Sequence, residues 1–260
     1  MSASSRWSGV GAAYRRSFAT LCAGTVDVLL ADTFGPDHLD VGCGTGTLAC
    51  AAAAAGRSVV AVDADPDMVE LTRGQAPEAH VEQMSLPELG LPSAAYDAVT
   101  ANIVINHLPD PRAAVRELAR VVRPGGRVAI TTWTGRRTAQ AVLFSESLTA
   151  AGAVPVSGQR LPAEVDFDRS PTGLEALTAA AGLTTVVARE LEWVWTVAWD
   201  DLWAAVSSGV ASIGETYLAQ DVATQARIEV EMRERARALE VDGVVRLPSV
   251  AAYMVASLAL

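Results

Sequence analysis

Residues 38–46 read His-Leu-Asp-Val-Gly-Cys-Gly-Thr-Gly, a short apolar segment that runs into a glycine-rich loop. An alanine-rich stretch, residues 48–55, follows with high intrinsic helix propensity. Glycines let the backbone approach a ligand closely, and the first turn of the next helix presents free N–H groups at the same point. The stretch therefore predicts a strand, a loop suited to close ligand approach, and a helix.

Two carboxylates accompany this loop. Asp40 lies two residues before Gly42, where its charge would repel a pyrophosphate and attract an ammonium group. Asp63 ends the apolar segment of residues 58–63, 21 residues after Gly42, where it can accept hydrogen bonds from both hydroxyls of a ribose. The third glycine of a dinucleotide fingerprint is replaced by Thr47, and with Asp40 this disfavours a nicotinamide dehydrogenase.

Strand and helix patterns alternate along the first half of the chain, which predicts a parallel sheet covered on both faces. Further strands are expected at 79–84, 96–102 and 127–133, after a turn at 123–126, and helices at 11–34, 66–74, 111–122 and 171–182. A long strand at 183–197 and a final apolar strand at 244–260 complete the pattern. Because no linker or repeat interrupts it, we expect one domain.

The composition excludes several classes of function. The chain has 260 residues and a net charge of −10, and all 20 of its basic residues are Arg. Without lysine it cannot carry a Schiff base or a P-loop, and its acidity argues against nucleic-acid binding. Three scattered Cys and three His predict neither a disulfide framework nor a metal site. No secretory signal or membrane span is evident, so we expect a cytoplasmic protein.

Four segments, taken in order, resemble the class I S-adenosylmethionine-dependent methyltransferases. They are LDVGCGTG at 39–46, VVAVDADPDMV at 59–69, LPSAAYDAV at 91–99 and VRPGGRVAITTW at 122–133. The resemblance implies a doubly wound, seven-stranded, mostly parallel Rossmann-like sheet with an antiparallel last strand. Within a single domain, 1–260, residues 1–35 would form a helical lid and 36–134 the cofactor-binding core. Residues 135–260 would form an insertion, a helical cap over the acceptor pocket and the closing strands.

The resemblance also implies a binding site for S-adenosyl-L-methionine. Its methionine moiety would lie near Asp40, its ribose would be bound by Asp63, and its adenine would pack on Ala64 and Met68. The other implied contacts are backbone atoms of Gly42, Cys43, Gly44 and Gly46, the residues Ser85 and Leu86 after the third strand, Asn102, and a lid formed by Tyr14 and Trp7. Ser85 stands where many members carry an acidic residue that binds the adenine amino group.

His107 is the candidate catalytic residue. It follows the fourth strand, at the edge where open α/β sheets bind ligands, and its imidazole can remove a proton near neutral pH. The alternative is that His107 bonds to backbone atoms and fixes its loop. Cys43 is expected to be a small loop residue, since no basic partner is evident that would activate its thiol.

Aromatic residues mark a candidate acceptor region. Trp133 ends the fifth strand and is the candidate substrate-binding residue. Trp193 and Trp195 share one face of a strand, and Trp199 and Trp203 one face of a helix. These four favour structural packing, with an aromatic wall for an apolar acceptor as the alternative.

The function predicted is methyl transfer to an oxygen, nitrogen or carbon atom of a small molecule, in a setting such as secondary metabolism, by a monomer or homodimer. The alternative is an S-adenosylmethionine-binding protein of the same fold with a non-methylating or structural role.

Overall fold

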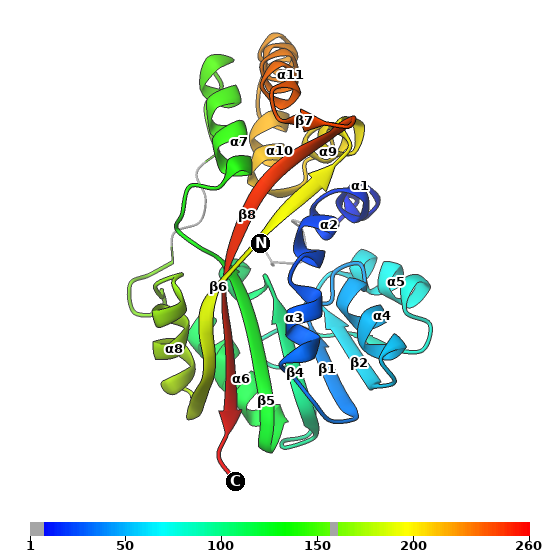
Figure 1. The fold of residues 1–260 in the computed structure, drawn as a ribbon, viewed down its shortest axis with the longest axis vertical. Helices are drawn as coiled ribbons and strands as arrows, with labels where there is room; N and C mark the ends of the chain where they lie inside the picture. The colour runs from blue at the N-terminus through cyan, green and yellow to red at the C-terminus, as the bar shows by residue number, and fades with distance from the viewer. Residues whose placement is uncertain (1–7, 157–160) are drawn as a thin grey trace.

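The computed structural model describes residues 8–156 and 161–260, which form a mixed α/β fold built on one eight-stranded sheet (Figure 1). The strands are β1 (Asp37–Val41), β2 (Ser58–Asp63), β3 (His80–Gln83), β4 (Tyr96–Asn102), β5 (Val122–Trp133), β6 (Leu183–Val197), β7 (Glu240–Val241) and β8 (Val244–Leu258). The helices are α1 (Gly11–Arg16), α2 (Phe18–Ala23), α3 (Val26–Ala31), α4 (Thr47–Ala54), α5 (Pro66–Gln75), α6 (Pro111–Val121), α7 (Ala139–Ala150), α8 (Pro171–Ala179), α9 (Trp199–Ser207), α10 (Ala211–Leu218) and α11 (Val222–Arg237).

The strand order β3-β2-β1-β4-β5-β8-β6 places β1 at the point where the order reverses. β1, β2, β3, β4 and β5 pair in parallel, while β8 is antiparallel to both of its long neighbours. This confirms the doubly wound, mostly parallel sheet with an antiparallel last strand. Ligands bind such sheets outside the carboxyl ends of the strands at the reversal point, which here is the loop after β1.

The sheet has one strand more than expected. β7 is a two-residue strand that pairs with the start of β8 across Asp242 and Gly243. Both of these residues have positive φ, 52° and 80°, which is the backbone of the tight hairpin turn that Asp-Gly favours.

Helices cover both faces of the sheet. In the largest apolar cluster, α6 buries Leu118 against β4 and β5, and α8 buries Leu174 against β6 and β8. On the other face, α3 and α4 bury Leu29 and Leu48 against β8. Residues whose side chains are almost fully buried thus hold the sheet rigid under the loops that follow its strands.

The long strands β6 and β8 extend beyond the parallel part of the sheet and carry a group of helices at their far end (Figure 1). α7, α9, α10 and α11 pack there around Leu202, Ile228, Met232 and Leu247. These helices belong to residues 135–260, the segment in which a helical cap was expected. That they cover an acceptor pocket stays a prediction.

The N-terminal segment forms three short helices instead of the single helix expected. Ser17 has φ −121° and ψ −96°, and its hydroxyl donates to the Ala13 carbonyl, 2.6 Å away, which ends α1. α2 ends at Gly24. A Cβ at this position would lie 2.3 Å from the Trp193 ring, so the close packing requires glycine here. The turn expected at 123–126 lies within β5. There the pairing of β4 with β5 changes register, from Tyr96 opposite Val122 to Ala98 opposite Arg127.

Within the described residues, no helix is both long and apolar enough to cross a membrane.

Asp65 begins α5 and is 1% exposed, and its Oδ1 accepts the N–H groups of Asp67 and Met68 at 2.9 and 3.3 Å. Asp65→Ala should therefore lower the free energy of unfolding by about 1–2 kcal/mol in denaturant titration. Asp65→Asn keeps an acceptor oxygen, so its free energy of unfolding should fall clearly less than that of Asp65→Ala. Equal losses in the two variants would contradict a capping role.

Candidate active site

The loop after β1 is fastened to the end of β2 by backbone hydrogen bonds. The N–H groups of Gly42 and Cys43 both donate to the Val62 carbonyl, at 2.8 and 3.0 Å. Gly44 donates its N–H to Asp63 Oδ2 at 2.9 Å, and its carbonyl accepts the Thr72 hydroxyl at 2.8 Å. The loop backbone is therefore held in one shape before any ligand arrives.

Two glycines of the loop are required for different reasons. Gly42 has φ +69°, and a Cβ there would lie 2.4 Å from Val104 Cγ2. Gly44 has φ +56°, and the nearest atom to its missing Cβ is Tyr14 Cε1, 3.7 Å away. Gly42 is thus closed in by the loop after β4, whereas Gly44 presents bare backbone to the space beneath Tyr14.

Asp63 is half-buried at the end of β2, and both of its oxygens bind backbone. Oδ2 accepts the Gly44 N–H and Oδ1 accepts the Asp65 N–H at 3.0 Å. Burial raises the pKa of Asp63, and these N–H donors counter that effect. Each oxygen keeps a further lone pair, so the carboxylate shapes the loop and retains acceptor capacity.

Asp40 is the charged group most deeply buried in the site, at 1% exposure. Its Oδ1 accepts the Thr100 hydroxyl at 3.2 Å, whereas its Oδ2 is buried without a hydrogen-bond partner. Burial raises the pKa of Asp40 to about 7, and the negative charge of Asp63 adds to this effect. A buried oxygen of this kind calls for a donor from a ligand, and a cationic donor would offset the cost of burial.

The cavity above the loop is small, about 40 Å³, and it is closed by the N-terminal helices. The residues that line it are Tyr14, Ala19, Cys22, Ala23, Asp40, Gly42, Cys43, Gly44, Thr45, Thr47, Leu48 and Asn102. This volume holds only one or two water molecules. A nucleoside therefore requires the N-terminal helices to move outward.

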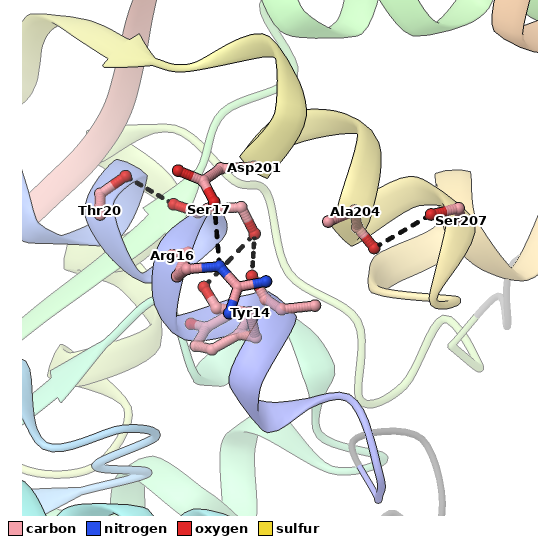
Figure 2. Close-up of polar contacts among 8 residues, drawn as sticks. Tyr14, Arg16, Ser17, Thr20, Asp201, Ala204 and Ser207 are labelled. Atoms are coloured by element: carbon pink, nitrogen blue, oxygen red, sulfur yellow. Dashed lines mark hydrogen bonds and ion pairs between the residues drawn. The ribbon is translucent and has the colours of Figure 1, made fainter.

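The polar contacts that hold α1 closed lie on its exposed flanks. Gly9 donates its N–H to Asp67 Oδ2 at 2.7 Å, and Arg15 donates to Gln75 Oε1 at 2.6 Å. Figure 2 shows the α1–α2 corner, where Arg16 pairs with Asp201 of α9 at 3.0 Å. Exposed polar contacts of this kind contribute little each. Val10 and Ala13 also pack in a buried cluster with Ala205 and Val210, so outward movement of α1 would separate these apolar contacts as well.

The adenine-side residues lie beside the same helix. Met68 is 3% exposed and its methyl group approaches Gly11 of α1. Ala64 is half-buried, and its carbonyl accepts Gln83 Nε2 at 3.0 Å. Ser85 is exposed in the loop after β3, while Leu86 packs against the main apolar cluster. Access to Met68 thus depends on the position of α1.

Asn102 joins three elements at the carboxyl edge of the sheet. Its Oδ1 accepts the hydroxyls of Thr25 at 2.8 Å and Thr131 at 2.6 Å, and its Nδ2 donates to the Cys22 carbonyl at 3.1 Å. Ile103 follows with φ 58°, which is rare for a β-branched residue and typical of functional loops. Asn102 therefore anchors α2 and α3 beside the cavity that it lines.

His107 lies in the short helical turn Ile105–His107 and is exposed, outside the residues that line the small cavity. Its Nε2 is 3.2 Å from Asn106 Nδ2.

Cys43 is buried with its sulfur 3.4 Å from the Thr72 hydroxyl. Burial raises the pKa of its thiol, as suits a loop residue that is not a nucleophile.

The tryptophans gather in the core under the cap. Trp133 stacks on Trp193 with ring centroids 6.2 Å apart, and Trp199 stacks on Trp203 at 5.7 Å. Trp195 is 2% exposed and donates its Nε1–H to Thr20. The cation over Trp199 is Arg233, at 5.0 Å from the ring centroid. The packing role favoured for the four later tryptophans fits these contacts, while Trp133 stays a candidate. Trp7 lies outside the described residues.

Two functional groups escaped the sequence analysis. Thr100 faces Asp40 across the β1–β4 register, and His38 lies behind it on β1. The sequence did contain one indication of this pair: His38 lies within an apolar strand, and a buried histidine needs a polar group as its hydrogen-bond partner.

Comparisons with known proteins agree with this geometry. Residues 39–130 match the family model described as a methyltransferase domain. A ubiquinone biosynthesis O-methyltransferase of Xanthomonas oryzae is 36% identical over 106 residues, 39% of this chain and 44% of that protein. A probable S-adenosylmethionine-dependent methyltransferase of Mycobacterium tuberculosis is 43% identical over 96 residues, 37% of this chain and 35% of that protein.

Residues 39–130 of this chain carry a methyltransferase domain of the S-adenosylmethionine-dependent kind. The chain spans less than half the length of the two curated relatives described. Among solved structures, the cyclase SpnF superposes with a TM-score of 0.53 at 19% identity, over 92% of this chain and 81% of that one. An identity this low shows the fold alone.

The residues present fit the cofactor that the family implies, S-adenosylmethionine. The unpartnered Asp40 Oδ2 suits its ammonium group, and the bare backbone at Gly44 leaves room for a close approach. Asp63 keeps acceptor capacity for hydroxyl groups.

Gly42→Ala adds a Cβ that overlaps Val104 and forces a left-handed backbone, so it should lower the free energy of unfolding by about 2–4 kcal/mol. Gly44→Ala adds no overlap, so its free energy of unfolding should fall only by the cost of the left-handed backbone, about 1–2 kcal/mol. We expect this variant to lose cofactor affinity as well.

The control is Gly74→Ala in α5, where nothing lies within 4 Å of the added Cβ. This change should raise stability by about 0.5–1 kcal/mol. Denaturant titration measures all three variants, and a loss at position 42 no larger than that at position 44 would contradict the close approach of Val104.

Proposed function

We propose that this protein transfers the methyl group of S-adenosylmethionine to an oxygen, nitrogen or carbon atom of a small molecule. The observation that carries the proposal is the pair of carboxylates beside the glycine loop, half-buried Asp63 and buried Asp40, the second of which has an oxygen without a partner. The O-methyltransferase relative favours oxygen as the acceptor atom.

The roles of the site residues follow from their positions. Asp40 would bind the ammonium group, Asp63 the ribose hydroxyls, and Ala64 and Met68 the adenine. The backbone of Gly42, Cys43, Gly44 and Gly46 would lie against the cofactor, with Ser85, Leu86 and Asn102 at its edges.

Tyr14 would act as a lid. Its Cε1 lies 3.7 Å from the missing Cβ of Gly44, and it is carried by helices whose polar contacts to α5 and α9 are exposed. Outward movement of α1 would admit the cofactor, and its return would exclude water from the reaction.

When bound, the cofactor supplies an electrophilic methyl group on a sulfonium and leaves as a neutral thioether. The protein's contribution is to hold donor and acceptor close and aligned, which supplies a large part of the rate in such transfers. Trp133 would position the acceptor at the end of β5.

His107 is the candidate for removing a proton from a weakly acidic acceptor, because it follows β4 on the ligand side of the sheet. His107 is exposed, which supports a position at the mouth of the site, where it would contact a bound acceptor.

A second function is a protein that binds the same cofactor without transferring its methyl group. The cyclase SpnF shares this fold, so the fold by itself does not require methyl transfer. Formation of S-adenosylhomocysteine together with a methylated acceptor decides between the two, because only the transferase yields both.

Asp63→Ala removes a carboxylate that both shapes the loop and accepts hydrogen bonds, so it should weaken S-adenosylhomocysteine binding by about 1.5–3 kcal/mol in calorimetry. Glu78→Ala, which removes an exposed carboxylate from the loop after α5, is the control and should bind normally. Unchanged affinity in Asp63→Ala would show that the ribose is bound elsewhere.

His107→Ala should lower turnover by about a hundredfold if the imidazole is the base, with cofactor affinity nearly intact. A more acidic acceptor should partly restore the rate, because it needs less proton transfer. Loss of thermal stability and cofactor affinity together, without such rescue, would instead indicate that His107 fixes its loop.

A further inference from the structure

A chain of buried hydrogen bonds runs from the turn after α4 to the cofactor site. Arg57 Nη1 lies 3.0 Å from His38 Nδ1, and His38 Nε2 lies 2.8 Å from the Thr100 hydroxyl. That hydroxyl lies 3.2 Å from Asp40 Oδ1. His38 and Thr100 are fully buried, so water does not substitute for the His38–Thr100 and Thr100–Asp40 contacts.

The chemistry of Arg57 sets the direction of the whole chain. A guanidinium only donates, so His38 Nδ1 must accept and the ring proton must sit on Nε2. Burial and the charge of Arg57 lower the pKa of His38 to about 3, which keeps the ring neutral. His38 Nε2–H then donates to Thr100, and the Thr100 O–H is left to donate. Its nearer acceptor is Asp40 Oδ1 at 3.2 Å, and the Leu39 carbonyl lies at 3.4 Å.

Arg57 is itself fixed by three further bonds. Its Nη1 donates to the Thr33 hydroxyl at 2.8 Å, and its Nη2 donates to the carbonyls of Leu30 and Thr33 at 2.7 and 2.8 Å. The donor that orients His38 is therefore rigid.

We propose that Thr100 is a positioning residue which, oriented by His38 and Arg57, keeps the Asp40 carboxylate ionised for the ammonium group of the cofactor. If His38 carried its proton on Nδ1, its Nε2 would compete for the Thr100 O–H, and Asp40 would face oxygen lone pairs instead. The ligand in this inference rests on the proposed function, whereas the effect on Asp40 itself does not.

Other titratable groups surround Asp40. They are Asp63 at the end of β2, the Cys43 thiol in the loop, and Tyr14 and Cys22 on the N-terminal helices. Burial raises the pKa of Cys22 to about 11 and also raises the pKa values of Cys43 and Tyr14, so these three stay neutral near pH 7. Asp63 is the other group that carries charge there, and the hydrogen-bond partners of the Thr100 hydroxyl are His38, Leu39 and Asp40.

The first experiment uses the ligand-free protein. Thr100→Val keeps the side-chain shape and removes the hydroxyl, so the titration midpoint of the Asp40 carboxyl, followed by ¹³C NMR, should rise by about one to two pH units. Thr100→Ser keeps the hydroxyl and should restore the wild-type midpoint. Arg57→Met frees the ring tautomer of His38 and should give a smaller upward shift. The Asp40→Asn spectrum assigns the signal.

The second experiment measures S-adenosylhomocysteine binding from about pH 6 to pH 9. The wild-type site loses affinity as pH falls through the Asp40 midpoint, because the protonated carboxyl no longer attracts an ammonium group. The ratio of the Thr100→Val and wild-type dissociation constants cancels the titration of the ligand. It should be about ten- to a hundredfold near pH 6 and fall within about twofold near pH 9.

Three outcomes separate the possible failures. A midpoint in Thr100→Val that is unchanged from wild type would overturn the proposal. A binding ratio that is constant with pH would also overturn it, since a purely structural loss does not depend on Asp40. If wild type binds no cofactor while the NMR midpoint moves, the proposed function fails and the hydrogen-bonded chain stands. Thr178→Val, a buried hydroxyl removed from α8, is the matched control and should leave the midpoint unchanged.

Discussion

The hydrogen bond from the Gly44 N–H to Asp63 joins the two halves of the site. It fixes the loop after β1 to the carboxylate that ends β2, and parallel pairing of the two strands brings these groups to the same edge. Gly42 and Cys43 add their N–H groups to the Val62 carbonyl on the same side. The shape of the loop, and with it the approach of any ligand, depends on this connection.

The same edge holds an unfavourable electrostatic arrangement. Burial raises the pKa of both Asp40 and Asp63; the charge of Asp63 adds to the effect on Asp40, and the charge of Asp65 adds to the effect on Asp63. Backbone N–H groups stabilise Asp63, and the Thr100 hydroxyl stabilises one oxygen of Asp40. The other oxygen of Asp40 has no donor, so the binding of a cation there would relieve a cost already present in the fold.

Much of this could be predicted from the sequence because local patterns carry it. The strands of residues 58–63, 96–102 and 183–197 have the bounds expected, and Asp65 caps its helix. Local departures decided part of the rest. Ser17 has non-helical dihedrals, φ −121° and ψ −96°, and interrupts the N-terminal helix. Asp242-Gly243 is a recognisable hairpin pair, yet only the strand from residue 244 onward was expected, without the short strand that pairs with it.

The site could be predicted in part for the same reason. The loop glycines, Asp40 and Asp63 form a motif in the sequence. The structure brings Asp40, Gly42 and Gly44 together around one cavity, and Asp63 accepts the Gly44 N–H beside it. His38 and Thr100 are 62 residues apart, so only the pairing of β1 with β4 reveals that they meet. The closure of the cavity by Tyr14 likewise depends on contacts between distant segments.

The central claim is that the glycine loop and its two carboxylates form a site for a sulfonium nucleoside. Calorimetry on a single preparation, titrated separately with S-adenosylmethionine and with NAD, tests this most directly. The account predicts saturable binding of S-adenosylmethionine at one site per chain and no binding of NAD. Binding of NAD without any binding of S-adenosylmethionine would contradict it.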